Sequence, residues 1–171
     1  MPNSVKKHIA CQPHNHNDCV DTAMALARTT CLEAGLRLTP TREQVLFLIW
    51  QSHKPLGAYD IIAQLTAHKH EGERKVIAPP TVYRALEFLL TQGFIHRIAS
   101  LNAFVGCSLH KAEHISQFLL CSQCGIAIEM DSQNINRAIQ QKADSFGFAI
   151  QSETIEVIGL CSRCQPGLSE A

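Results

Sequence analysis

The sequence predicts an α+β fold in two parts, a helical N-terminal half that ends in a hairpin and a smaller α/β C-terminal half. Three observations support this prediction. Apolar residues recur at helical spacing up to Gly93, residues 94–105 alternate between apolar and polar side chains, and two Cys-x2-Cys pairs follow short apolar runs further on. With 171 residues, of which 46% are hydrophobic, the chain can form one domain or two small ones.

Four helices are predicted ahead of the hairpin. Gly35 and Gly93 mark helix ends, while Thr39-Pro40-Thr41-Arg42 and Pro79-Pro80-Thr81 are start signals. The predicted helices cover residues 20–34, 45–50, 58–67 and 79–92, with residues 68–78 as a charged loop. The hairpin in residues 94–105 turns near Ser100-Leu101-Asn102.

The fourth predicted helix has one apolar and one polar face. At 100° per residue, the apolar side holds Val82, Ala85, Leu86, Leu89 and Leu90, and the polar side holds Thr81, Arg84, Glu87 and Thr91, with Tyr83 at the flank. Helices followed by a hairpin are the arrangement of a winged helix-turn-helix domain, whose last helix suits the major groove of DNA. The same pattern also fits a small helical domain with an ordinary hairpin.

The C-terminal half is predicted to be a small sheet with one covering helix. Strands are expected over residues 115–120, 125–130 and 154–160, and the helix over residues 132–146, capped by Ser132 and ended by Gly147. The apolar face of this helix consists of Ile135, Ala138, Ile139, Ala143 and Phe146. Such a small sheet gains stability by pairing with a second copy, so we expect a homodimer with an α/β dimerisation domain.

Two Cys-x2-Cys pairs, Cys121/Cys124 and Cys161/Cys164, predict a structural zinc site. Each short turn presents two sulfurs, and two such knuckles complete a tetrahedral four-thiolate site. A redox function would place the pair at a strand-to-helix junction, whereas both pairs here follow apolar strands. A four-thiolate site is closed and does no chemistry.

Composition excludes several classes of protein. Basic and acidic side chains balance at 15 each, but residues 1–98 carry 11 basic and 8 acidic ones. The N-terminal half is therefore better suited than the C-terminal half to bind a polyanion. No apolar run is long enough for a membrane helix or a signal peptide, and we expect a cytoplasmic protein with no membrane partner. A zinc deaminase would show His-x-Glu and Pro-Cys-x-x-Cys, and both are missing, so we expect no enzyme and no small-molecule substrate.

Several motifs resemble those of the ferric uptake regulator family. They are the run Leu38-Thr-Pro-Thr-Arg42, the segment Ala58-Tyr59-Asp60, the block from Pro79-Pro-Thr-Val-Tyr-Arg84 to Phe94, and the two Cys-x2-Cys pairs. The likeness covers about residues 20–165 and is nearest to the branch of zinc uptake regulators. The iron-sensing branch carries His-His-Asp-His ahead of the first knuckle, where this chain reads His110-Lys-Ala-Glu-His114.

The resemblance implies the fold, the partners and the site residues of such a regulator. Its regulatory zinc site corresponds to His96, Cys107, His114 and Glu129, a thiolate, imidazole and carboxylate set that suits Zn(II). Its DNA contacts correspond to Tyr59, Thr81, Tyr83 and Arg84, and helical phase independently places Arg84 on the polar face. The implied protein is a dimeric repressor of zinc-uptake genes that holds two zinc ions per chain and binds double-stranded operator DNA.

Alternative interpretations of these residues stay open. Lone histidines are commonly surface groups, Cys107 fits a buried apolar thiol, and Glu129 fits the polar face of an alternating strand. An iron- or peroxide-responsive regulator of the same family and a structural zinc module that binds protein are the rival functions. His110 is an additional ligand candidate outside the predicted set.

The predicted domain boundaries follow from these assignments. They comprise a flexible tail (1–18), a winged-helix domain (19–98), a hinge (99–108), a dimerisation domain (109–165) and a second tail (166–171). The N-terminal cluster of Cys11, His14, His16 and Cys19 is predicted to be a flexible, weakly metal-binding segment. Cys31 fits either the core or a redox-sensitive thiol, and neither role is assigned. Zinc shared by His96 and the hinge residues is expected to bias the angle between the two halves.

Overall fold

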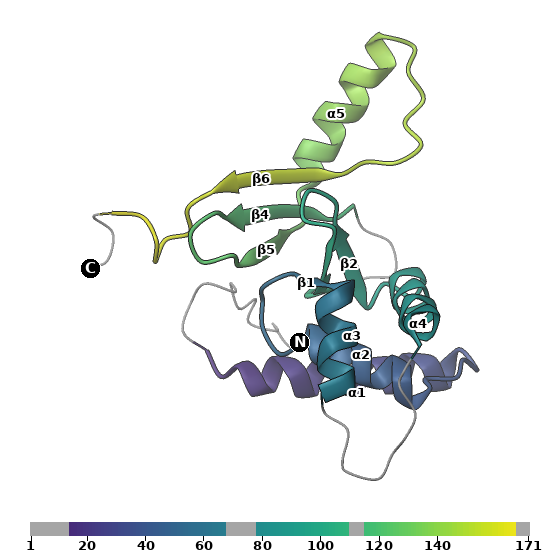
Figure 1. Ribbon diagram of the computed structural model, residues 1–171. Helices are drawn as coiled ribbons and strands as arrows, with labels where there is room; N and C mark the ends of the chain where they lie inside the picture. The colour runs from purple at the N-terminus through teal and green to yellow at the C-terminus, as the bar shows by residue number, and fades with distance from the viewer. Residues whose placement is uncertain (1–13, 68–77, 110–114, 167–171) are drawn as a thin grey trace, which may run out of the picture.

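The computed structural model describes residues 14–67, 78–109 and 115–166 (Figure 1). Predictions for the loop 68–77 and for Cys11, His110 and His114 therefore lie outside the described residues. The elements in chain order are α1 (His16–Glu33), α2 (Pro40–Ile49), β1 (Leu56–Gly57), α3 (Ala58–Ala67), α4 (Pro79–Thr91), β2 (Ile95–Ile98), β3 (Ala103–Gly106), β4 (Gln117–Cys121), β5 (Ala127–Met130), α5 (Gln133–Ser145) and β6 (Ile155–Gly159). The α+β prediction is confirmed.

The helix boundaries follow from local capping. The Thr39 side chain accepts a hydrogen bond from the Arg42 backbone N–H and starts α2, and Gly93 has a φ of 69° just beyond α4. The start predicted for the first helix is wrong by four residues, because the Asn15 side chain accepts from the Asn17 N–H and caps the chain there. Residues 16–18 are therefore part of α1.

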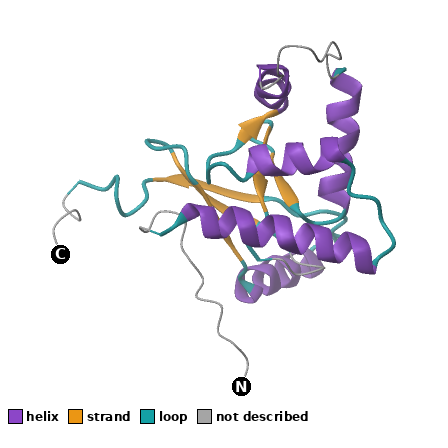
Figure 2. Ribbon diagram, turned by 90° about the horizontal axis from the view of Figure 1, so that it is seen from below, coloured by secondary structure: helices purple, strands orange, loops and turns teal. Residues whose placement is uncertain are grey.

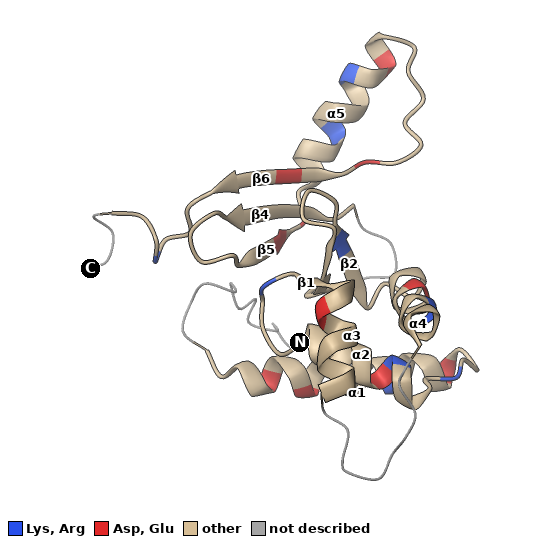
Figure 3. Cartoon of the chain, in the orientation of Figure 1, with Lys and Arg blue, Asp and Glu red and all other residues tan. Residues whose placement is uncertain are grey.

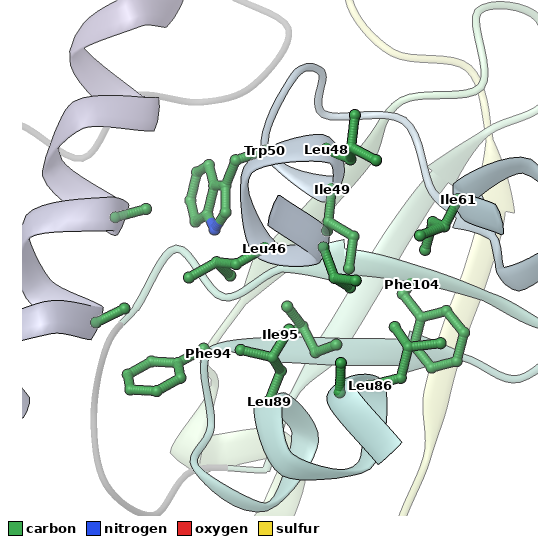
Figure 4. Packing of buried hydrophobic residues seen from close by; sticks show 14 of the residues in the cluster. Leu46, Leu48, Ile49, Trp50, Ile61, Leu86, Leu89, Phe94, Ile95 and Phe104 are labelled. Atoms are coloured by element: carbon green, nitrogen blue, oxygen red, sulfur yellow. The ribbon is translucent and has the colours of Figure 1, made fainter. Parts of the chain in front are cut away.

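The N-terminal half packs its helices against a three-stranded wing sheet. The strand order is β1-β3-β2, with antiparallel pairing throughout, and Asn102 adopts a φ of 47° in the predicted turn. The two-residue strand β1 is an addition to the prediction. Figure 4 shows the core between α2, α3 and α4, where Leu46, Ile49, Ile61, Leu86 and Leu89 are almost completely buried.

The C-terminal half is a second three-stranded sheet. Its strand order is β5-β4-β6, with β5 antiparallel and β6 parallel to β4. In Figure 2 the strands lie at the centre of the molecule, among the helices.

The prediction that the last helix covers this sheet is wrong. Helix α5 projects away from the sheet (Figure 1), and none of its residues is buried. Ile135 and Ile139 are half-buried, while Phe146 beyond the helix is 74% exposed. The apolar face of α5 is therefore not packed against the sheet of its own chain.

The two halves share a small apolar core. Ile98 and Val105 from the wing sheet pack with Phe118, Leu120 and Ala127 from the second sheet. Two residues, His53 and Glu156, also accept hydrogen bonds between the two halves. The Ala127 N–H donates to the His53 carbonyl at 3.0 Å, and Glu156 accepts hydrogen bonds from the N–H groups of Ala99 (2.6 Å) and Ser100 (3.1 Å).

The predicted hinge range 99–108 contains strand β3, which pairs with β2 over its whole length. Strand β3 also pairs with β1, so residues 103–106 form the central strand of the wing sheet and not a free hinge. The exact domain boundaries stay a prediction. Within the described residues, no helix combines the length and apolar character needed to cross a bilayer.

Candidate metal centres and nucleic-acid interface

The two cysteine pairs meet at the ends of β4 and β6. The sulfurs of Cys121, Cys124, Cys161 and Cys164 all lie within 4.8 Å of one another, and Cys124 Sγ is 3.7 Å from Cys161 Sγ. A tetrahedral zinc with bonds of about 2.3 Å separates its sulfurs by roughly 3.8 Å. The parallel pairing of β4 with β6 brings the two knuckles together, so the geometry fits the predicted four-thiolate site.

Hydrogen bonds favour the thiolate form of Cys121 within this site. The Cys161 N–H donates to Cys121 Sγ at 3.4 Å. Backbone N–H groups of Cys124 and Cys161 lower the pKa of Cys121 to about 6, although burial opposes the shift. A lower pKa favours the thiolate, which is the metal-binding form of cysteine.

A second group of candidate ligands lies where the two halves meet. His96 comes from β2, Cys107 follows β3, and Glu129 comes from β5, and their ligand atoms lie within 4.8 Å of one another. His96 Nε2 is 2.9 Å from Glu129 Oε1, and Cys107 Sγ is 3.9 Å from the same oxygen. The structure therefore brings together three of the four predicted ligands, and His114 lies outside the described residues.

Two serines support these ligands and were missed by the sequence analysis. The Ser108 N–H and hydroxyl donate to Glu129 Oε2 at 2.7 and 2.9 Å. The Ser116 hydroxyl donates to Glu129 Oε1 at 3.2 Å and lies 3.1 Å from His96 Nδ1. Partners of this kind fix the orientation of metal ligands. Serine is too common a residue for either position to stand out in the sequence.

The chemistry of this second group suits a borderline metal ion. A thiol, an imidazole and a carboxylate are the donor types of Zn(II) sites, whereas Mg(II) and Mn(II) prefer sites made of oxygen. Cys107 is completely buried, and the Glu129 side chain is 3% exposed. A buried carboxylate needs cationic or hydrogen-bonding partners, and a metal ion supplies a cationic one.

The four residues that were predicted to contact DNA are all exposed. Tyr59, at the start of α3, is 79% exposed and Tyr83 is 46% exposed, and Thr81 and Arg84 are exposed on α4. Val82, Leu86 and Leu89 are buried on the opposite side of α4, as the helical phase predicts. Figure 3 shows charges of both signs on α4.

A groove of about 770 Å³ runs between α3, α4 and the wing turn. Tyr59 and Tyr83 line it together with Asp60, Glu87 and Arg97. Arg97 Nη2 donates to Asn102 Oδ1 at 2.7 Å, which holds the guanidinium beside the wing turn. Arg97 is a basic residue on the wing beside this groove, and it was not among the residues predicted from the sequence.

Comparison with known proteins gives the family. The sequence model described as the ferric uptake regulator family matches residues 33–158. The chain belongs to the ferric uptake regulator family. The zinc uptake regulation protein of Escherichia coli strain K12 is 36% identical over 142 residues, which cover 82% of this chain and 80% of that protein.

Solved structures of this family share the fold. A zinc uptake regulator complexed with zinc and DNA superposes with a TM-score of 0.75 at 34% identity, covering 85% of this chain and 94% of that one. Holo XcZur gives 0.69 and apo XcZur gives 0.51, both at 40% identity and 86% coverage of this chain, with 97% and 98% of those chains covered. The chain as a whole thus superposes better on the holo than on the apo structure.

Proposed function

We propose that this protein is a zinc-responsive transcriptional repressor that binds operator DNA as a dimer and represses zinc-uptake genes. The observation that carries the proposal is the convergence of His96, Cys107 and Glu129 from both halves of the chain onto one point. The similarity to a zinc uptake regulator in complex with zinc and DNA supports the DNA-binding part. Such a regulator acts in the cytoplasm.

The regulatory site works by joining the two halves. A bound zinc ion would supply a common partner for His96 of the wing sheet and for Glu129 of the second sheet, with Cys107 and His114 as the other ligands. In the structure, the carboxylate of Glu129 contacts Ser108, Ser116 and His96. Without zinc, the small shared core and the hydrogen bonds of His53 and Glu156 would hold the two halves together. A metal bound by ligands from both halves would therefore make the angle between them depend on zinc.

The proposed DNA contacts come from the exposed side of α4. Arg84 makes no ion pair within the described part of the chain, so its guanidinium is available for the two acceptors of a guanine edge. Tyr59 offers a hydroxyl at the start of α3, and Thr81 and Tyr83 flank the same surface. The carboxylates of Asp60 and Glu87 in the groove would repel DNA phosphates. This repulsion favours DNA contacts by the exposed residues outside the groove.

The dimer interface is proposed on the outer strand of the second sheet. Val157 and Ile158 on β6 are 49% and 67% exposed, and Phe146 and Phe148 beyond α5 are also exposed. An apolar surface of this kind on a small sheet needs a covering partner. A second copy would bury it and would give α5 the packing that a single chain lacks, and the four-thiolate site would hold the ends of β4 and β6 in place.

The test is operator binding with and without metal. Fluorescence anisotropy is measured on a promoter fragment from a zinc-uptake gene, after chelation of the regulatory metal and then with Zn(II), Fe(II) or Mn(II) at buffered free concentrations. Zn(II) is expected to restore tight binding at the lowest concentration. Restoration by Fe(II) alone would favour the iron-responsive alternative, and binding that ignores metal would contradict the proposal.

A further inference from the structure

Three histidines and a cysteine meet at the N-terminal end of α1. His14, His16 and Cys19 come from the start of the described chain, and His53 comes from the loop between α2 and β1. Their ligand atoms all lie within 4.8 Å of one another. The rings of His14 and His16 are 5.1 and 4.6 Å from the ring of His53, measured between centroids. This cluster shares no residue with the two groups described above.

Helix geometry orders this cluster, contrary to the prediction of a flexible segment. The Asn15 cap starts α1 at His16, and Cys19 follows three residues later on the same face of the helix. His53 then reaches the cluster from 34 or more positions away, with its Nε2 3.0 Å from His14 Nε2. His14, His16 and Cys19 are close together in the sequence, whereas His53 joins them only in the folded chain.

The hydrogen bonding of His16 is typical of a metal ligand. Its Nε2 lies 2.7 Å from the Trp50 carbonyl oxygen, which can only accept, so Nε2 carries the proton. In the neutral ring the lone pair then belongs to Nδ1, and this nitrogen is buried with no hydrogen-bond partner among the described residues. Histidine ligands commonly donate one ring N–H to a backbone carbonyl and bind the metal through the other nitrogen.

From this geometry, we propose that His14, His16, Cys19 and His53 form a third metal site with a preference for Zn(II). Three imidazoles and one thiolate are a four-coordinate, borderline-soft donor set, which tetrahedral Zn(II) accepts and Mg(II) or Mn(II) does not. Zinc bonds of about 2.0–2.3 Å place neighbouring ligand atoms roughly 3.3–3.7 Å apart. Small rotations of side chains that are only half-buried bring the four atoms from their present separations to these values.

The site also has a structural consequence. It joins the start of α1 to the loop that contains His53, and the carbonyl of His53 accepts the 3.0 Å hydrogen bond from Ala127 at the start of β5. Metal binding therefore stiffens a contact between the two halves, at a place remote in sequence from the regulatory ligands. The chain then holds three metal ions, one more than the sequence predicts.

Cobalt binding tests the site without DNA. The full chain, with zinc retained by the four knuckle thiols, carries Cys11→Ser and Cys107→Ser, which leaves Cys19 and Cys31 as its other thiols. Co(II) is then added, and sulfur-to-cobalt charge transfer in the near ultraviolet reports a thiolate ligand. One Co(II) per chain with this band is expected, and Zn(II) should displace it. No Co(II) binding in this background would overturn the proposal.

Matched variants assign the ligands. In the same background, Cys19→Ser should abolish the charge-transfer band, and His53→Ala should weaken Co(II) binding at least 10-fold. Cys31→Ala, which removes a thiol from the same helix outside the cluster, should leave both unchanged. A band that persists in Cys19→Ser, or that depends on Cys31, would refute the assignment. Because regulation of DNA binding is not measured, failure here is distinct from failure of the proposed function.

Discussion

Ser116 offers a sensitive test of the regulatory site, because it touches two of the proposed ligands without being one. Its hydroxyl lies 3.1 and 3.2 Å from the two ring nitrogens of His96 and donates to Glu129 at 3.2 Å. A hydrogen bond to a charged group contributes about 1.5–3 kcal/mol. Loss of such a partner typically lowers metal affinity by about 10–100-fold. We expect Ser116→Ala to fall in this range.

The assay is operator binding at buffered free zinc. The Ser116→Ala midpoint should move to free zinc concentrations about 10–100-fold higher, with unchanged affinity for DNA at saturating zinc. Ser122→Ala is the matched control, since the Ser122 hydroxyl donates to the Gly159 carbonyl at 3.2 Å beside the cysteine cluster. An unchanged midpoint in Ser116→Ala, or an equal shift in Ser122→Ala, would refute the reasoning.

Three further predictions concern DNA contact, folding and packing. Arg84→Ala should weaken operator binding by about 1–3 kcal/mol and relax the preference at one base of each half-site, while equal losses on random DNA in a competition assay would indicate a phosphate contact. Cys164→Ser should abolish the dimer and lower zinc content in gel filtration with metal analysis; a dimeric protein with a normal melting curve would contradict this. Gly106→Ala places a methyl group 2.2 Å from the Trp50 ring and should cost about 1–3 kcal/mol in denaturant unfolding, so wild-type stability would show that the indole moves freely.

Much of the fold could be predicted because it depends on short-range signals. The Thr39 cap, Pro79 and the glycines after the helices act within one turn of the chain, and the predicted third helix matches α3 at both ends. Strand β1 has only two residues and depends on pairing with β3, so no local sequence pattern predicts it. The orientation of α5 depends on what covers its apolar face, which the local sequence does not contain.

The candidate sites also contain parts that could be predicted from the local sequence and parts that depend on tertiary packing. Cysteine pairs are visible in the sequence because two ligands share one turn, whereas Ser108 and Ser116 become relevant only when β5 brings Glu129 beside them. The N-terminal segment with Cys11, His14, His16 and Cys19 was predicted to be flexible because no strand or turn signal orders it, and the contribution of His53 could not be seen because this residue is distant in the sequence. The local ligand pattern was therefore visible, but its completion depends on tertiary packing.

The central claim is that a metal shared by the two halves controls DNA binding, and the zinc dependence of His96→Ala tests it most directly. Operator affinity is measured by anisotropy with buffered zinc and with a chelator that leaves the cysteine-bound zinc in place. The wild type should bind operator DNA about 5–150-fold more tightly with zinc than without it, which is the usual range of coupling between two binding sites. His96→Ala should remain dimeric and keep its cysteine-bound zinc, yet bind equally under both conditions. A wild-type zinc response in His96→Ala would contradict the account.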